Sequence, residues 1–218
     1  MLILGLDTST SAITTALHDG DRLLAQASVE DARAHTERLA PLILEVLAAA
    51  GASPRDLTDV AVGTGPGPFT GLRVGLVTAV TMGHALGIPV HGVGSLDALA
   101  HGARSRVEGE VLVASDARRK EVYWARYAVS PTSVVALTSP AVDRPADLPE
   151  GLRSLPTIGR GPLLFPDLFP HPVGVLDVAA AHLVDLALVR IAAGEPMPLA
   201  PMYLRRPDAL TLAERAAP

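Results

Sequence analysis

The pattern of hydrophobic and polar positions predicts strands at the start of the chain and helices after them. Residues 2–7 form a continuous apolar run that ends at a carboxylate, and residues 12–18 and 22–29 form two more β-type runs. The last two runs are joined by residues 19–21, Asp-Gly-Asp, and an Asp-Gly pair between β-type runs is a strong hairpin signal. The chain is therefore predicted to open with three antiparallel strands.

A helix is predicted over residues 36–50, because apolar side chains recur there with helical spacing. Gly51 is a suitable residue to end it. Pro41 conflicts with the pattern, since proline is tolerated only near a helix start, so a boundary or a kink is expected there. The apolar face comprises Leu39, Leu42, Ile43, Val46, Leu47 and Ala50.

The rest of the first half alternates short strands with helices. Ser95 is expected to cap the N-terminus of one of these helices, because a serine hydroxyl can accept a hydrogen bond from the first turn. The predicted elements are a strand over 57–63, a glycine-rich turn over 65–71, a helix from there to about Leu86, a strand over 90–93 and a helix over 96–103.

A second unit begins near residue 110 and repeats the order of the first. Residues 110–115 predict a buried strand that ends before Asp116, residues 121–129 a returning strand, and residues 134–137 a third. The order of strand, acidic turn and two further strands matches the start of the chain, although no residue-level repeat accompanies it. An α/β protein of two lobes is predicted, with residues 1–108 in the first and 109–218 in the second.

The remaining segments are less regular. Residues 139–156 are rich in proline and charge and are predicted to form a loop, and residues 157–161 a short strand. A helix is predicted over residues 177–193 with Asp177 as its cap. The proline-containing tail, residues 195–218, is expected to extend over the surface.

Composition narrows the classes of function. The chain has 218 residues, of which 49% are hydrophobic, and it carries a formal net charge of −5. Zero cysteines exclude disulfides, thiolate metal sites and a cysteine nucleophile. The acidic balance disfavours unaided tRNA or DNA binding. The first apolar run is too short for a signal peptide, and no run approaches a membrane span, so a soluble cytoplasmic protein without a membrane partner is expected.

The glycine-rich segment 65–71 allows two interpretations. Glycines between a strand and a helix let a phosphate approach the free N–H groups of the helix N-terminus. The same residues also suit a tight strand-to-helix connection that binds nothing. A P-loop is excluded because the segment lacks the Gly-Lys-Ser/Thr sequence that would reach the phosphates.

The helix after this segment carries a small residue at every fourth position: Gly71, Gly75, Ala79 and Gly83. Interior glycines each cost up to about 1 kcal/mol relative to alanine, so another element is expected to pack closely along them. That element is either the protein's own sheet or a helix of another chain. Leu72, Leu76 and Val80 lie on a neighbouring ridge and are expected to be buried in either case.

Two acidic turns are candidate nucleotide-binding groups. Asp7, Thr8 and Ser9 close the first strand, and Asp116 stands at the equivalent turn of the second unit. Carboxylates and hydroxyls at such turns can hold Mg²⁺ and phosphates, but they also commonly bond to their own turn. The histidines show no metal-binding spacing, so no metal site is predicted.

Six motifs, in this order and over nearly the whole chain, resemble the TsaB family of bacterial proteins required to make threonylcarbamoyladenosine in tRNA. The stretch 65–75 is the most specific of them. The motifs are residues 4–9 (Leu-Gly-Leu-Asp-Thr-Ser), 35–39 (His-Thr-Glu-Arg-Leu), 65–75 (Gly-Pro-Gly-Pro-Phe-Thr-Gly-Leu-Arg-Val-Gly), 116–118 (Asp-Ala-Arg), 121–124 (Glu-Val-Tyr-Trp) and 203–205 (Tyr-Leu-Arg).

The resemblance implies an actin-like fold, of the class of acetate kinase, heat-shock protein 70 and the sugar kinases. It implies pairing with a TsaD-like paralogue, which transfers the threonylcarbamoyl group to the adenosine beside the anticodon, together with a small TsaE-like ATPase. Without the paralogue, the chain is expected to form a homodimer through the surface that would otherwise contact the paralogue. The residues expected at that partner interface are Leu39, Leu42, Val46, Gly71, Leu72, Gly75, Leu76, Ala79 and Gly83.

Departures from the catalytic paralogue imply a catalytically silent subunit. The paralogue holds a metal with two histidines spaced H-x-x-x-H, whereas this chain has His91 followed by Ser95. The resemblance therefore implies no catalytic residue and no tightly bound cofactor, with ATP and Mg²⁺ relevant only in the complex and tRNA held mainly by the partner.

Two other functions remain open from the sequence. A stand-alone actin-like ATPase or small-molecule kinase would use Asp7 and Asp116 as Mg²⁺ ligands, but the first turn lacks the glycine that phosphate approach requires. A metallopeptidase would need a metal triad and a polarised water, and the ligand spacing for it is missing.

Overall fold

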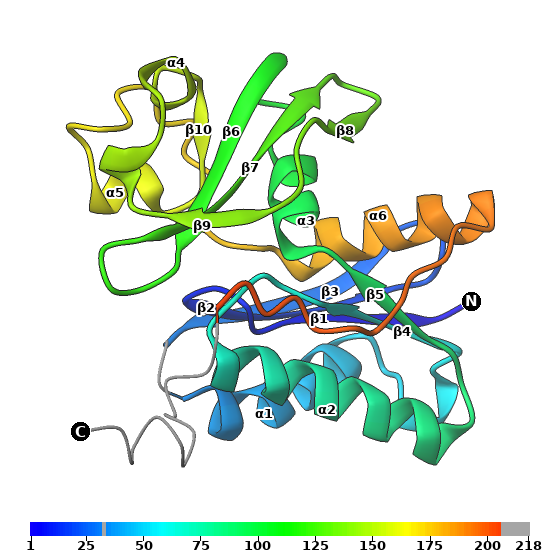
Figure 1. The fold of residues 1–218 in the computed structure, drawn as a ribbon. Coiled ribbons are helices and arrows are strands. Elements are labelled where there is room, and N and C mark those ends of the chain that lie inside the picture. Colours follow the sequence, from blue (N-terminus) through cyan, green and yellow to red (C-terminus); the bar gives the residue numbers. More distant parts are fainter. Residues whose placement is uncertain (32–33, 206–218) are drawn as a thin grey trace, which may run out of the picture.

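A computed structural model describes residues 1–31 and 34–205 of the chain. Its first sheet has the strand order β3-β2-β1-β4-β5 (Figure 1). β1 pairs antiparallel with β2 and parallel with β4, and β2 pairs antiparallel with β3. The predicted opening meander is confirmed. The strands are β1 (Ile3–Asp7), β2 (Ala12–His18), β3 (Leu23–Glu30), β4 (Asp59–Gly63) and β5 (Val90–Val93).

Helices cover both faces of this sheet because successive side chains of each strand point to opposite sides. Helices α1 and α2 lie on one side of the sheet, and α3 and α6 lie on the other (Figure 1). Leu4 and Leu6 of β1 pack toward α1 and α2, while Ile3 and Gly5 face α3 and α6. Both faces of the central strands are therefore buried. The covering helices are α1 (His35–Ala49), α2 (Phe69–Leu86), α3 (Ser95–Gly102) and α6 (Ala180–Ala193).

The second sheet repeats the opening of the first. β6, β7 and β8 form an antiparallel meander, β10 joins β6 in parallel, and β9 pairs with β7. Two mixed sheets that each begin with such a meander confirm the expected actin-like α/β fold. The strands are β6 (Gly109–Asp116), β7 (Val122–Val129), β8 (Val134–Ala136), β9 (Ala141–Asp143) and β10 (Thr157–Ile158).

Several local predictions were wrong. The predicted loop 139–156 contains β9, a 3-10 turn (Pro145–Asp147) and the short helix α4 (Glu150–Arg153), and α5 (Gly161–Leu164) follows β10. A second 3-10 turn, Pro54–Asp56, precedes β4. Helix α1 continues through Pro41, so the predicted boundary is absent there, while the alternative of a kink stays a prediction. The strand β9 and the helices α4 and α5 are too short for a hydrophobic period to appear. Helix α1 tolerates the one hydrogen bond that Pro41 cannot donate.

Neither predicted cap caps its helix. Ser95 is the first residue of α3, after Gly94 at the cap position, and its hydroxyl donates a hydrogen bond to Asp7 Oδ2 at 2.8 Å. Ala179 holds the cap position of α6, while Asp177 accepts hydrogen bonds from Arg160. In both cases the side chain that the sequence predicted as a helix cap instead forms hydrogen bonds with a residue distant in sequence.

The C-terminal part of the described chain returns to the first sheet. Val184 of α6 packs so closely on Gly5 that a Cβ at Gly5 would overlap it. Further along, Gly92 donates its N–H to the Met197 carbonyl and Met202 donates to the Thr64 carbonyl. The division at residue 108 stays a prediction, and this packing ties the end of the described chain to β1 and β5. Residues 206–218 of the predicted tail lie outside the described residues.

A buried histidine lies where α3 packs on α6. His101 is 5% exposed, and its Nε2 has no hydrogen-bond partner among the described residues. Burial, with the nearby positive charge of Arg104, lowers the pKa of His101 to about 4, although Asp185 acts in the opposite direction. The folded protein therefore resists protonation of this ring.

This histidine is expected to make the fold acid-sensitive. In the unfolded chain His101 has its ordinary pKa of about 6.5. The contribution of the neutral His101 ring to stability is therefore fully present above that pH and is lost as the pH falls toward 4. Between about pH 7.5 and pH 5 the loss is expected to be about 2 kcal/mol in the free energy of unfolding. Urea unfolding across this range measures it. In His101→Leu the free energy of unfolding should depend less steeply on pH. An unchanged dependence would mean that another group causes the acid sensitivity.

Candidate nucleotide and partner sites

The first candidate nucleotide turn is occupied by its own hydrogen bonds. Asp7 has no exposed surface. Its Oδ1 accepts from the Ser9 N–H at 2.8 Å and the Ser9 hydroxyl at 2.7 Å, and its Oδ2 accepts from Ser95. Burial raises the pKa of Asp7, although these hydrogen bonds act in the opposite direction. Both carboxylate oxygens are engaged, so Asp7 offers no free face to a metal or a phosphate.

Thr8 locks the end of β1 into helix α2. Its hydroxyl donates to the Gly71 carbonyl at 2.7 Å and accepts the Gly75 N–H at 3.1 Å. These two backbone groups are four residues apart, the spacing of an intrahelical hydrogen bond, so the hydroxyl is inserted into the helix ladder. A Cβ at Gly71 would lie 2.6 Å from the Thr8 carbonyl oxygen, and one at Gly75 would lie 2.5 Å from Thr8 Oγ1.

The protein's own sheet therefore accounts for the small-residue stripe. Ala79 is fully buried in the core between sheet and helices, and a Cβ at Gly83 would overlap Val90 of β5. All nine residues that were predicted at the partner interface are buried within this chain. They are Leu39, Leu42, Val46, Gly71, Leu72, Gly75, Leu76, Ala79 and Gly83.

The opposite sides of α1 and α2 are exposed and partly apolar. Leu44 of α1 is 61% exposed, and Val77 of α2 is 63% exposed. Val80 is 45% exposed, contrary to the prediction that it is buried. The two helices lie side by side beneath the first sheet (Figure 1). Leu44, Val77 and Val80 are called the α1–α2 face below.

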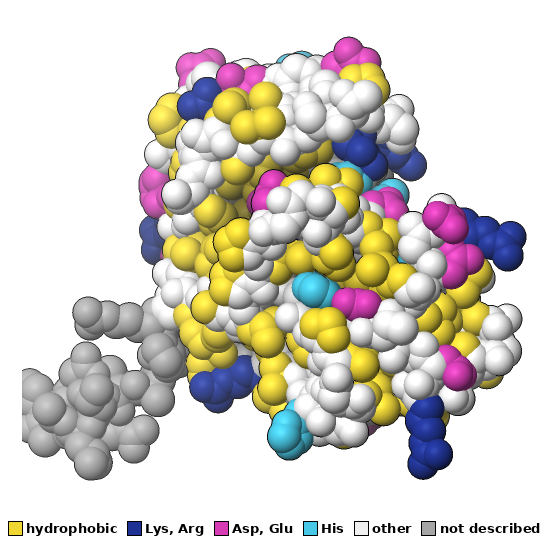
Figure 2. Space-filling view, turned by 90° about the vertical axis from the view of Figure 1, so that its right-hand side faces the viewer, with side chains coloured by type: hydrophobic (Ala, Val, Ile, Leu, Met, Phe, Trp, Pro, Cys, Tyr) yellow, Lys and Arg dark blue, Asp and Glu magenta, His cyan; other side chains and the backbone are white. Residues whose placement is uncertain are grey.

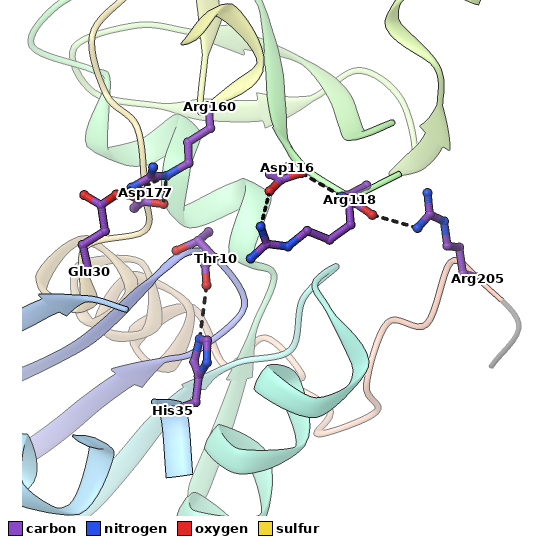
Figure 3. Close-up of polar contacts among 9 residues, drawn as sticks. Thr10, Glu30, His35, Asp116, Arg118, Arg160, Asp177 and Arg205 are labelled. Carbon is purple, nitrogen blue, oxygen red and sulfur yellow. Dashed lines mark hydrogen bonds and ion pairs between the residues drawn. The ribbon is translucent and has the colours of Figure 1, made fainter. Parts of the chain in front are cut away.

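The second candidate turn also binds its own residues. Asp116, at the end of β6, accepts the Arg118 N–H at 2.7 Å and pairs with the Arg118 guanidinium at 3.0 Å (Figure 3). Arg118, Arg119 and Lys120 all have positive φ, near 60°, which is unusual for residues with side chains. The turn thus presents basic side chains where a phosphate-binding hairpin would have small ones.

The glycine-rich segment is largely a packed connection. Gly67 lies against the Ser9 backbone, where a Cβ would come within 2.6 Å of the Ser9 carbonyl oxygen. The Gly67 carbonyl accepts a hydrogen bond from Tyr123 of β7 at 3.3 Å, and the Gly65 N–H donates to Ser95 Oγ at 3.1 Å. The interpretation as a tight strand-to-helix connection fits these contacts, since the glycines make room for protein rather than for a ligand.

A pocket of about 250 Å³ remains at the N-terminus of α2. Arg118 reaches into it from the β6–β7 turn, and His35 closes it from α1, with its Nε2 3.3 Å from the Thr10 carbonyl oxygen (Figure 3). A guanidinium, hydroxyls and helix N–H groups suit an oxyanion in chemical terms. The lining comprises Thr10, His35, Thr36, Pro68, Thr70, Gly71 and Arg118.

His91 and Ser95 serve different elements. His91 Nε2 lies 2.9 Å from Asp59 Oδ1, while the Ser95 hydroxyl bonds to Asp7. Among the described residues, no group of three or more histidine, aspartate or glutamate side chains is placed to hold a metal ion. None of the described helices is long and apolar enough to cross a membrane.

Sequence reasoning missed the contacts of two arginines that join distant parts of the chain. Arg160, before α5, forms a bidentate pair with Asp177 and an ion pair with Glu30 of β3 at 2.7 Å (Figure 3). Arg205 donates to the Ala117 carbonyl at 2.7 Å and pairs with Glu121. No local spacing signals a contact across more than eighty residues. For Arg205, only its place in a family motif marked it.

Fold and site together define a class: an actin-like α/β protein whose two acidic turns are bound by its own side chains. A family model described as TsaD, tRNA N6-adenosine threonylcarbamoyltransferase, matches residues 25–178. The Escherichia coli tRNA threonylcarbamoyladenosine biosynthesis protein TsaB is 34% identical over 94% of this chain and 95% of its own length. The chain belongs to the TsaB family.

Other similar proteins also match most of this chain. An uncharacterized Mycobacterium tuberculosis protein is 44% identical over 97% of this chain and 95% of its own length. A Mycobacterium leprae relative is 43% identical, and the chain spans only 56% of its length. The solved structure titled YeaZ from Pseudomonas aeruginosa has a TM-score of 0.79 and 31% identity, covering 93% of this chain and 99% of that one.

Proposed function

We propose that this chain is a catalytically silent subunit in the biosynthesis of threonylcarbamoyladenosine in tRNA. In this proposal it pairs with a TsaD-like paralogue that performs the transfer, and a TsaE-like ATPase joins the complex in the cytoplasm. The observation that carries the proposal is family membership combined with two acidic turns whose carboxylates bind their own chain.

The proposed partner surface is the α1–α2 face. Leu44, Val77 and Val80 expose apolar surface on two adjacent helices, where buried side chains on the other side already fix the helices to the sheet. Apolar groups gathered on adjacent helices are typical of a docking surface. In the absence of the paralogue, the same face would pair with a second copy of the chain.

Transfer RNA is proposed to bind mainly through the partner. The chain carries a net charge of −5. Figure 2 shows the side of the molecule where the C-terminal ends of α2 and α6 lie. Hydrophobic side chains dominate the middle of this side, and Lys and Arg stand mostly apart from one another at its margins. On this side of the molecule, the dispersed cations give little of the electrostatic attraction that phosphates require.

Nucleotide is proposed to act only in the assembled complex. The pocket at Arg118 has the chemistry for an oxyanion but a volume of about 250 Å³ and no lysine in its lining. A partner surface placed over this open pocket would supply further walls. Neither ATP nor Mg²⁺ is proposed to bind the isolated chain tightly, and the stand-alone ATPase would require the engaged carboxylate of Asp7 to release its partners.

The first experiment is light scattering behind size exclusion, on the chain alone and mixed with the TsaD-like paralogue of the same organism. A one-to-one complex that displaces any homodimer is the expected result. Mass spectrometry of nucleosides should then show threonylcarbamoyladenosine formed by the paralogue with this chain and not without it. Equal formation in both reactions would overturn the proposal. ATP turnover by the isolated chain would instead support the ATPase alternative.

A further inference from the structure

The last described segment of the chain, residues 197–205, crosses from the first sheet to the second. It contains no helix or strand and runs back along the first sheet (Figure 1). Its first part is fixed there through the backbone. Gly92 of β5 donates its N–H to the Met197 carbonyl at 3.1 Å, and Met202 donates to the Thr64 carbonyl at 2.8 Å. This segment, residues 197–205, is called the latch below.

Tyr203 anchors the latch to the start of α2. The centroid of its ring lies 5.0 Å from that of Phe69, and its hydroxyl accepts a hydrogen bond from Arg73 Nε at 3.3 Å. The Arg73 guanidinium lies over the Phe69 ring, 3.6 Å from its centroid, in a cation–π contact. Two residues four positions apart on one helical face therefore hold the aromatic side chain of the latch.

Arg205, at the end of the latch, reaches the turn between β6 and β7. Its guanidinium donates to the Ala117 carbonyl at 2.7 Å (Figure 3) and pairs with the Glu121 carboxylate. The Ala117 N–H in turn donates to the Glu121 carbonyl at 3.1 Å, which closes the base of the turn. The Arg205 and Glu121 side chains are only 24% and 27% exposed, so solvent screens their attraction less than that of a fully exposed pair. Arg205 thus binds both ends of the turn.

The turn has a backbone conformation that its own residues disfavour. Arg118, Arg119 and Lys120 have φ values of 61°, 54° and 62°. In this left-handed region the Cβ atom crowds the backbone, and none of the three residues is a glycine. Three such residues in succession persist only where surrounding contacts hold them. Asp116 supplies one such contact by accepting the Arg118 N–H, and Arg205 supplies others from outside the turn.

We propose that the latch holds the β6–β7 turn in its left-handed form, with Arg205 as the positioning residue, and so keeps Arg118 in the pocket at the N-terminus of α2. Among the residues that line this pocket, Arg118 comes from the turn of the second sheet, and the others lie between residues 10 and 71. When the latch is released, the turn relaxes and the guanidinium leaves the pocket. The inference concerns the isolated chain and does not rest on the proposed tRNA function.

The test is cleavage of the folded chain, without added lysines, by a protease that cuts only after lysine. Lys120 is the only lysine of the 218 residues, so the protease cuts one bond, and that bond lies in the turn. When opening and closing are fast, the cleavage rate follows the fraction of molecules in which the turn is open. Arg205→Gln removes the charge that binds Glu121 and is expected to raise this rate about tenfold or more. A rate equal to that of the original chain would overturn the proposal.

The dependence of cleavage on urea separates a released turn from a weakened fold. Opening of the turn alone exposes little surface, so the rate in Arg205→Gln should rise only shallowly with urea. A rise as steep as that of complete unfolding would show that Arg205 stabilises the whole chain and does not position the turn. Hydrogen exchange at the Ala117 amide gives a second measurement and should accelerate by about the same factor as cleavage.

Tyr203→Ala tests the latch as a unit, because Tyr203 contacts α2 and not the turn. It is expected to raise the cleavage rate about threefold or more; an unchanged rate would contradict the role of the anchor. Arg126→Gln is the matched control. Arg126 of β7 pairs with Glu110 at 2.6 Å and is 34% exposed, so it resembles Arg205 but lies away from the turn. Its loss should leave cleavage unchanged, and an equal acceleration would mean that the effect is not specific to the latch.

Discussion

Replacing Gly75 by leucine is expected to destabilise the fold by about 4 kcal/mol or more, enough to unfold a marginally stable domain. A side chain at this position would meet Thr8 Oγ1 at the Cβ, 2.5 Å away, and displace the hydroxyl from the α2 ladder. The expected cost combines overpacking with a buried hydroxyl and a backbone carbonyl that lose their partners, less the helix propensity that glycine forgoes. Urea unfolding followed by circular dichroism measures it.

Val77→Leu is the matched control, because Val77 lies in the same helix with 63% of its surface exposed. It should change the free energy of unfolding by less than about 0.5 kcal/mol. Ala79→Arg should behave like Gly75→Leu, since Ala79 has no exposed surface. If Gly75→Leu or Ala79→Arg folded normally and lost only its association with a partner, the stripe would be an interface and the packing described above would be wrong.

The small-residue stripe of α2 shows what a sequence pattern can and cannot identify. Regular glycines indicated that something approaches α2 closely, and both its own sheet and a second chain satisfied that requirement. At Gly71 and Gly75 the group that approaches is Thr8, more than sixty residues away in sequence. Spacing within a helix cannot identify a partner that comes from another strand, so only the structure could decide between the two.

The opening meanders were predictable because their signals are local. Asp-Gly between two β-type runs specified the hairpin of β2 and β3, and the antiparallel register of these strands agrees with it. The short strand β9 had no such signal: it pairs with β7, and Trp124 donates its indole N–H to Asp143 at 2.8 Å. Three residues are too few for alternation to appear.

The sequence predicted the residues of the candidate site, but it did not predict whether their oxygens are free to bind a ligand. Asp7 and Asp116 do stand at the two equivalent turns, as the pattern indicated. Whether their oxygens are free depends on Ser95 and on the backbone of the Arg118 turn, and a sequence without contacts does not show which acceptors are already taken. The same limit applies to Asp177, which was assigned to a helix cap and instead binds Arg160.

Charge placed on the α1–α2 face is expected to abolish association. The double variant Leu44→Asp, Val77→Asp puts two carboxylates on apolar surface that is more than 60% exposed at both positions, so the folded chain can keep both in water. In a complex the same groups would be buried without partners, which costs several kcal/mol. Affinity for the TsaD-like paralogue, or for a second copy of the chain, is expected to fall about 100-fold or more, equivalent to about 2.7 kcal/mol.

Isothermal titration calorimetry measures the affinity, and thermal unfolding shows whether the variant remains folded. Val189→Asp on α6 is the matched control, because Val189 is 59% exposed but lies on the other side of the first sheet. It should leave both association and melting temperature unchanged. If the double variant bound as tightly as the original chain, the partner would have to dock elsewhere. If Val189→Asp weakened binding equally, the apolar character of this particular face would not explain association.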